Sequence, residues 1–172
     1  MRKLVSDEYK EMLRINHAKY TWGGGGHPKS IVKYATRVHE TSILDYGCGS
    51  GVLTKELNEL YPGCYTIFEY DPGVIGKDTP PSPCNFVVCT DVLEHVEPEC
   101  VENVIDDLQR VVSGFGYFRI CCCPAYGALS DGRNLHLTQE PPEWWLEKLA
   151  SRFKIVEKRH HPKSLFVFVS SL

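Results

Sequence analysis

The chain has 172 residues, with 19 Lys and Arg, 22 Asp and Glu, and a formal net charge of -3. This length suits one compact domain and is too short for two ordinary ones, and a hydrophobic share of 42% excludes disorder over most of the chain. The acidic balance argues against a protein that holds nucleic acid by bulk charge, and the apolar runs are too short to span a bilayer.

Two helices separated by a glycine run are predicted in the first forty residues. Apolar side chains recur at helical spacing in Asp7–His17 and in Pro28–His39, where the proline suits a first turn. The glycines at 23–26 break both helices. We expect residues 1–40 to form an N-terminal helical segment, either a lid or a linker, and residues 41–172 to form the core of a single domain spanning 1–172.

Strands and helices alternate over the rest of the chain. Strands are predicted at Ser42–Tyr46, Cys64–Tyr70, Asn85–Thr90, Phe115–Cys123, Phe153–Lys158 and Ser164–Val169, and helices after Gly51, at Glu99–Val112 and at Pro141–Ser151. This alternation predicts an α/β fold with a mostly parallel sheet of about six strands and helices on both faces. Only the last connection is too short for a helical crossover, so one antiparallel strand is expected near the C-terminus.

A glycine-rich loop joins the first strand to the following helix. Gly47, Gly49 and Gly51 let the backbone pass close to a ligand at a helix N-terminus. The spacing fits neither the dinucleotide fingerprint nor a phosphate-binding P-loop. Glu69 ends the next strand, 20 residues after Gly49, where a carboxylate can accept both hydroxyls of a ribose. Together these features predict a nucleoside-like cofactor.

Three segments in this order resemble the signature motifs of the class I S-adenosylmethionine-dependent methyltransferases. They are Ile43-Leu-Asp-Tyr-Gly-Cys-Gly-Ser-Gly51, the acid at Glu69 followed by Tyr70-Asp71-Pro72, and Val87-Val-Cys-Thr-Asp-Val-Leu-Glu-His-Val96. The resemblance implies a Rossmann-like methyltransferase fold, S-adenosyl-L-methionine as cofactor and methyl transfer as the activity. The family sheet has seven strands, so this chain resembles a trimmed version.

The resemblance also implies which residues meet the cofactor. The implied residues are Asp45, Gly47, Cys48 and Gly49 around the methionine part, Glu69 with Tyr70 at the ribose, and Cys89, Thr90 and Asp91 on the opposite wall. In the segment where the family carries an acid near the adenine amine, Asp78 is the candidate.

Two histidines are candidates for the catalytic residues. His95 follows the third predicted strand, and His136 lies in the long loop 125–140, and either could act as a general base. An alternative uses Asp91, Glu94, His95 and His136 as ligands of one divalent metal ion. That set is similar to the Glu-x-x-Glu-His plus distant His arrangement of metal-dependent small-RNA 2′-O-methyltransferases, with Asp91 in place of the first Glu.

The loop and helix from Ala125 to Trp145 are predicted to form the substrate wall. Candidate substrate-binding residues are Tyr126, Arg133 and Asn134 in this segment and Trp22 in the N-terminal segment. Arg133 could grip a phosphate or a carboxylate. Arg119 stands inside an apolar strand, and the sequence gives it no role.

Several interpretations of the function remain open. We expect a small-molecule acceptor, such as a nucleotide or sugar derivative. A nucleic-acid or protein acceptor is one alternative, and a non-catalytic methyltransferase-like binding module is another. A basic stripe beside the cofactor would favour a polymer, and a closed pocket a small molecule. The oligomeric state stays open.

The eight cysteines favour a reducing compartment. No two have Cys-x-x-Cys spacing, and the start of the chain lacks the apolar segment of a secretory signal. We therefore expect free thiols, a cytoplasmic protein and no membrane association. Cys121–Cys123 are expected to be small buried hydrophobic side chains.

Overall fold

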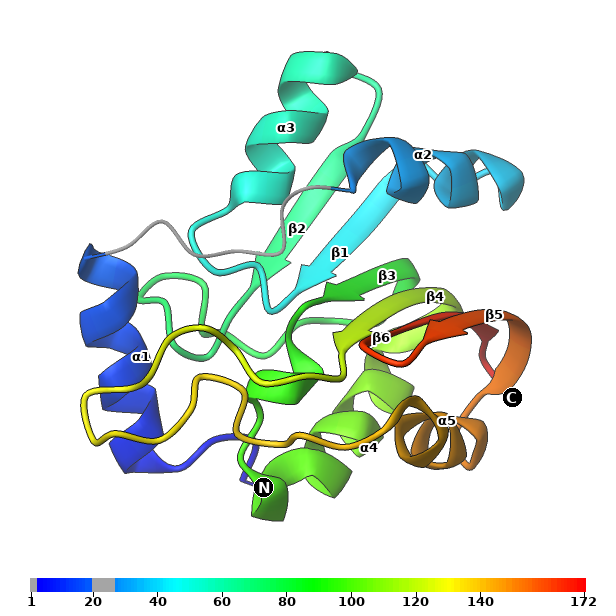
Figure 1. Ribbon diagram of the computed structural model, residues 1–172. Coiled ribbons are helices and arrows are strands. Elements are labelled where there is room, and N and C mark those ends of the chain that lie inside the picture. Colours follow the sequence, from blue (N-terminus) through cyan, green and yellow to red (C-terminus); the bar gives the residue numbers. More distant parts are fainter. Residues whose placement is uncertain (1–2, 20–26) are drawn as a thin grey trace.

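A computed structural model describes residues 3–19 and 27–172 of the chain (Figure 1). The helices are α1 (Asp7–Lys19), α2 (Pro28–Arg37), α3 (Val52–Leu60), α4 (Val101–Val111) and α5 (Pro142–Ala150), with short 3-10 helices at Leu93–His95 and Pro98–Cys100. The strands are β1 (Ser42–Tyr46), β2 (Thr66–Tyr70), β3 (Cys84–Thr90), β4 (Val112–Cys121), β5 (Lys154–His161) and β6 (Ser164–Ser170). No helix in the described ranges is long and apolar enough to cross a membrane.

The six strands form one sheet in the order β2-β1-β3-β4-β6-β5. Strands β2, β1, β3 and β4 are parallel, and β6 runs antiparallel to both of its neighbours, β4 and β5. Strand β6 reverses because only residues 162–163 separate it from β5, which leaves no room for a crossover. The predicted mostly parallel sheet with one antiparallel strand near the C-terminus is confirmed.

Helices cover both faces of the sheet, as predicted. Apolar side chains of α2 and α3, such as Ile31 and Leu57, pack with Phe86 and Phe168 on one face. Those of α4 and α5 pack on the other face, where Trp145 is fully buried. Figure 1 places α1 and the loop after β4 beyond the carboxyl ends of the parallel strands. This is the edge where sheets of this kind bind ligands.

Several predicted boundaries are wrong by a few residues. Helix α2 ends at Arg37 rather than at position 39, because His39 takes a left-handed backbone conformation with φ of 59°. Helix α4 begins at Val101, because a 3-10 turn precedes it, and it leads directly into β4 at Val112. Strand β5 extends to His161, three residues beyond its predicted end, because it pairs along β6 as far as the turn.

All eight cysteines lie within the described residues and are free thiols. Cys48, Cys89 and Cys100 are buried and behave as small apolar side chains. Cys121, Cys122 and Cys123 are only half-buried, because the chain leaves the sheet at the end of β4. The expectation that these three are buried is therefore wrong.

Candidate functional site

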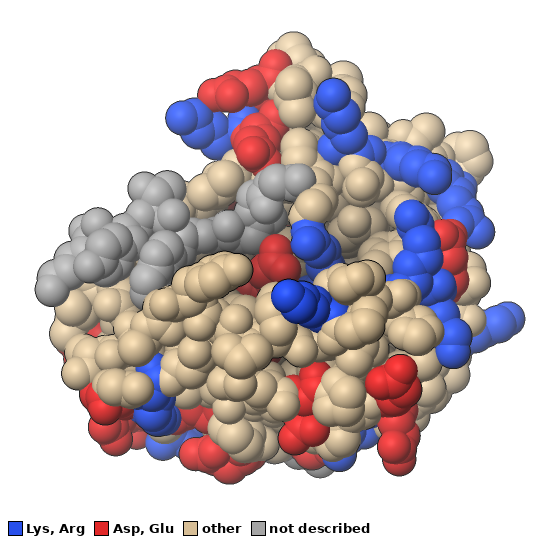
Figure 2. All heavy atoms as spheres, viewed as in Figure 1, with Lys and Arg blue, Asp and Glu red and all other residues tan. Residues whose placement is uncertain are grey.

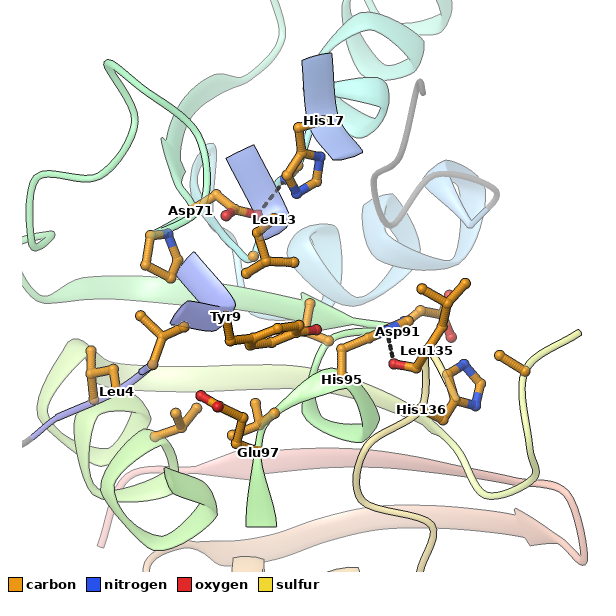
Figure 3. Close-up of a pocket in the computed structure, with 18 of the residues that line it drawn as sticks. Leu4, Tyr9, Leu13, His17, Asp71, Asp91, His95, Glu97, Leu135 and His136 are labelled. Carbon is orange, nitrogen blue, oxygen red and sulfur yellow. Dashed lines mark hydrogen bonds between the residues drawn. The ribbon is translucent and has the colours of Figure 1, made fainter. Parts of the chain in front are cut away.

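A cavity of about 540 Å³ opens at the carboxyl ends of the strands (Figure 3). Its walls come from α1, the glycine loop after β1, the turn after β3 and the loop after β4. The main lining residues are Tyr9, Leu13, His17, Gly47, Gly49, Asp71, Asp91, Val92, His95, Glu97, Tyr126, Leu135 and His136. The volume is within the range of pockets that enclose a small organic ligand.

The glycine loop is fixed by hydrogen bonds to the end of β2. The backbone N–H of Gly47 donates to the Tyr70 carbonyl at 2.7 Å, and that of Gly49 donates to Oδ2 of Asp71 at 2.9 Å. Gly47 has a φ of 83°, and a Cβ there would lie 2.4 Å from Cγ2 of Val92. The loop therefore needs glycine at position 47 both for its conformation and for its close approach to Val92.

The predicted cofactor residues fall into two groups. Gly47, Gly49 and Asp91 line the cavity directly. The others lie behind this lining, with Asp45, Cys48, Tyr70, Cys89 and Thr90 all buried. Glu69 is half-buried at the end of β2, where its carboxylate accepts from Thr54 Oγ1 at 2.6 Å and pairs with Lys77 at 2.8 Å. The structure thus brings the predicted motifs to one edge of the sheet.

Carboxylates cluster around the glycine loop. Burial, followed by the charges of Glu69 and Asp71, raises the pKa of Asp45 to about 7, and its Oδ2 atom has no hydrogen-bond partner among the described residues. Burial alone would raise the pKa of Glu69, but the hydrogen bonds from Lys77 and Thr54 outweigh it and lower that pKa. Lys77 also approaches the Gly49 carbonyl at 3.4 Å. This edge of the cavity favours a cationic ligand.

Helix α1 supplies a wall that the sequence did not predict. Tyr9 is only 3% exposed and lines the cavity together with His17, which points toward Asp71 in Figure 3. The backbone N–H and hydroxyl of Ser6 both donate to the Glu97 carboxylate, at 2.7 and 2.6 Å, and so tie the start of α1 to the turn after β3. The helical spacing of Tyr9 was visible in the sequence, but nothing there indicated what α1 packs against.

The two predicted histidines come together at the other end of the cavity. Their rings meet edge to face, with centroids 4.8 Å apart. Nδ1 of His95 lies 2.8 Å from the Leu135 carbonyl oxygen, and Nδ1 of His136 lies 2.5 Å from that of Cys123. Because a carbonyl oxygen only accepts, each Nδ1 carries the proton of the neutral ring and each Nε2 keeps a lone pair. Burial, followed by the neighbouring His136, lowers the pKa of His95 to about 4.

Glu94 completes a group of three with these histidines. One ligand atom from each of Glu94, His95 and His136 lies within 4.8 Å of the others, and Asp91 is not part of this group. The Cys121 N–H donates to Oε1 of Glu94 at 2.9 Å, whereas Oε2 is buried and has no partner in the described structure. Burial raises the pKa of Glu94 to about 8.

The predicted substrate-wall residues differ in what they contact. Tyr126 is fully exposed at the mouth of the cavity. Arg133 does not line the cavity, because its guanidinium pairs with Asp131 at 2.7 Å. The Asn134 side chain holds the loop together through the backbone of Ala125 and His136. Trp22 lies outside the described residues.

Asp78, the candidate for the adenine side, is engaged by α1. Its Oδ2 atom pairs with Lys10 at 3.3 Å and with Arg14 at 3.5 Å. These contacts hold the outer face of α1 against the loop after β2. The carboxylate therefore has a structural task in the structure described.

A family model described as a methyltransferase domain matches residues 6–157. The fold is similar to Burkholderia thailandensis 1,6-didemethyltoxoflavin-N1-methyltransferase, solved with bound 1,6-didemethyltoxoflavin and S-adenosylhomocysteine. The TM-score is 0.67 at 15% identity, over 99% of this chain and 92% of that one. TehB from Haemophilus influenzae gives 0.61 at 14% identity, over 95% and 67%.

Human N-acetylserotonin methyltransferase in complex with SAM is also similar, with a TM-score of 0.58 at 15% identity. The match covers 84% of this chain and 51% of that one, so this chain spans about half of the human enzyme. At such identities the likeness shows the fold. No curated protein matches the chain closely enough to count as a relative.

Proposed function

Because the chain belongs to the methyltransferase domain family, we propose that it transfers a methyl group from S-adenosylmethionine to a small-molecule acceptor. The observation that carries this proposal is the glycine loop, whose Gly47 and Gly49 line the cavity together with Asp71 and Asp91. The sulfonium and ammonium groups of S-adenosylmethionine are cationic, and the carboxylates of Asp71 and Asp91 on the cavity wall would supply the complementary charge.

The chain's own residues would then position the two reactants. Gly47 and Gly49 would let the methionine part pass close to the backbone, and Glu69 would accept the ribose hydroxyls. When bound, the cofactor supplies an already activated methyl group, so the protein mainly has to align the acceptor and exclude water. Helix α1 and the loop after β4 would close the site from two sides.

The other half of the cavity would hold the acceptor. Tyr9, Leu135 and the paired histidines give it apolar walls with a few polar atoms, which suits a nucleotide or sugar derivative that carries a planar ring. His136 would take the acceptor proton at Nε2, with Nδ1 fixed by the Cys123 carbonyl. The solved neighbour with bound 1,6-didemethyltoxoflavin supports an acceptor of this size.

A metal-assisted version is the second candidate, and one observation favours it. One ligand atom from each of Glu94, His95 and His136 lies within 4.8 Å of the others, and backbone groups fix all three side chains. Two imidazoles and a carboxylate would hold a divalent ion and leave positions open for acceptor oxygens. Asp91 is left out of this candidate because its carboxylate is not part of the group.

Calorimetric titration with S-adenosylmethionine and S-adenosylhomocysteine tests the proposal. Micromolar binding of both ligands is expected, and it should be lost when the glycine loop is altered. If the folded protein binds neither ligand, the cofactor assignment is wrong. If it binds both but methylates no nucleotide, sugar or aromatic acceptor in a broad screen, a binding module without catalysis becomes the better interpretation.

A further inference from the structure

Arg119 is a half-buried cation at the edge of the proposed site. It lies in β4, and among the described residues its guanidinium makes no hydrogen bond or ion pair. Its carbonyl accepts the N–H of Asp91 at 3.0 Å, so it is next to the cavity wall. The other cationic candidate, Arg133, is already paired with Asp131. With no hydrogen bond in the described structure, the guanidinium of Arg119 has its N–H donors available for a ligand.

A second arginine lies on the same face of the sheet. Phe166 in β6 is opposite Arg119 in β4 and opposite Arg159 in β5, so the three side chains form a row across neighbouring strands. The two arginines are two strand spacings apart, roughly 10 Å between backbones, and both side chains are long enough to converge. The Arg159 guanidinium lies 4.9 Å from the Phe166 ring centroid and donates to the Tyr34 hydroxyl at 2.7 Å.

These side chains line a small hollow of about 180 Å³. Ser164, His160 and His161 complete its polar lining. The hollow is below the size that encloses a whole drug-like ligand, so it suits one functional group. Arg37 and Arg159 share the Glu157 carboxylate, at 2.9 and 3.3 Å, Glu143 lies 3.8 Å from His160, and the charge of Arg119 acts on Glu94. The two guanidiniums line the hollow itself, whereas none of these carboxylates does.

The surrounding surface extends this charge. Figure 2 shows Lys and Arg side chains gathered on the side of the molecule that carries α2, β5 and β6. Lys29, Lys33 and Arg37 are exposed on α2 at four-residue intervals, which places them along one face of that helix. A ligand group with negative charge would be drawn toward the hollow from this side.

We propose that the hollow between Arg119 and Arg159 is a subsite for a phosphate group of the methyl acceptor. Two guanidiniums offer paired N–H donors that match phosphate oxygens, and the Ser164 hydroxyl can donate a further hydrogen bond. The adjoining cavity would hold the part of the acceptor that is methylated. That the bound phosphate belongs to a methyl acceptor rests on the proposed function. That the hollow binds phosphate does not.

The experiment uses the full chain without cofactor. Amide resonances are followed by NMR during titration with inorganic phosphate and, separately, with a nucleoside 5′-monophosphate and the matching nucleoside. Saturable shifts in β4, β5 and β6 around Arg119, Arg159 and Ser164 are expected for both phosphates. Shifts confined to the glycine loop, or no saturable shifts, would overturn the subsite.

Three variants locate the effect. Arg119→Gln should weaken phosphate binding at least tenfold, and Arg119→Lys should keep part of it. Lys158→Gln is the matched control, because it removes the same charge one residue from Arg159 but on the opposite face, beside Val167. Equal losses in Arg119→Gln and Lys158→Gln would mean diffuse electrostatics and would refute the subsite. Thermal unfolding of each variant checks that it folds.

Two further measurements separate the remaining questions. S-adenosylhomocysteine should bind Arg119→Gln as it binds the wild type, so failure of the subsite and failure of the cofactor assignment give different results. The same NMR titration with a single-stranded oligonucleotide tests whether the phosphate belongs to a polymer. If its shifts spread over Lys33 and Arg37 and its affinity falls steeply with salt, the phosphate belongs to a chain, whereas tighter binding of the monophosphate assigns it to a small acceptor.

Discussion

The ammonium of Lys77 lies 2.8 Å from Oε2 of Glu69, at the end of β2, where a ribose would be held. Thr54 donates to the other carboxylate oxygen, so both oxygens are engaged before any ligand arrives. The ribose hydroxyls must therefore share Oε2 with Lys77 or displace it. Because the pair is about three-quarters buried, it keeps the carboxylate ionised and in place for a ligand.

Glu69→Ala is expected to weaken S-adenosylhomocysteine binding by about 10- to 150-fold, which corresponds to about 1.5–3 kcal/mol for hydrogen bonds to a charged group. Calorimetry measures the loss directly. Glu59→Ala is the control, since it removes an exposed carboxylate of α3 that pairs with Lys55. Unchanged affinity in a folded Glu69→Ala protein would show that the ribose is held elsewhere.

Gly47→Ala should remove cofactor binding as well as cost stability. Its new Cβ would lie 2.4 Å from Val92 Cγ2, on a wall of the cavity, so either the loop or Val92 has to move. Gly63→Ala is a matched control, because Gly63 has a similar φ of 73° but open space around it. A left-handed alanine should lower the stability of both variants by about 1–2 kcal/mol, but only Gly47→Ala should lose S-adenosylhomocysteine binding. Normal S-adenosylhomocysteine binding by Gly47→Ala would place the ligand away from this loop.

Asp45→Asn should change how stability depends on pH. Burial raises the pKa of Asp45 from 3.8 to about 7, so between these values the folded state holds a proton that the unfolded chain has released. The contribution of Asp45 to the free energy of unfolding is therefore fully present below pH 4. It is lost as the pH rises to 7, by up to about 1.4 kcal/mol per pH unit. Asn has no charge to bury, so the variant should gain stability relative to the wild type over this range.

Denaturant unfolding of both ligand-free proteins from pH 4 to 8 measures that difference. Comparing the two proteins cancels the opposite contribution of His95, whose pKa is lowered to about 4. A constant difference across the range would show that Asp45 is ionised at every pH and has a partner when folded.

Periodicity predicted most of the fold. The regular apolar stripes of Pro28–Arg37 and Val101–Val111 identified both helices, and a short connection was enough to reverse β6. The errors lie at ends of elements, where local patterns compete. Position 39 continues the helical spacing, for example, but His39 takes a positive φ and ends the turn.

The site was predictable only where a motif is continuous in sequence. The glycine loop and the acid at Glu69 are such motifs, and they meet at one edge of the sheet. The roles of Tyr9 and Arg119 depend on packing between segments far apart in the chain, so neither could be predicted. Arg133 was expected to bind a ligand, but a neighbour two residues away, Asp131, already neutralises it.

The last prediction concerns His136 and distinguishes a general base from a metal ligand. If His136 is a base, His136→Ala should lower the maximal rate by about 10²–10⁴-fold and leave S-adenosylhomocysteine affinity intact. Chelators should then have no effect on the wild type. In a third case, His136 only shapes the wall of the acceptor site. His136→Asn should then keep much of the maximal rate and change mainly KM.

If His136 is instead a metal ligand, different results are expected. Co²⁺ added to chelator-treated protein should give the visible absorption of a nitrogen- and oxygen-ligated ion at one equivalent, without any acceptor present. His95→Ala and His136→Ala should both lose that band, because both rings and the Glu94 carboxylate would share the ion. Asp91→Asn should keep it, since Asp91 stands outside this group. Wild-type protein that gives no Co²⁺ band would exclude the three-ligand site and leave Nε2 of His136, held in its tautomer by the Cys123 carbonyl, as the proton acceptor.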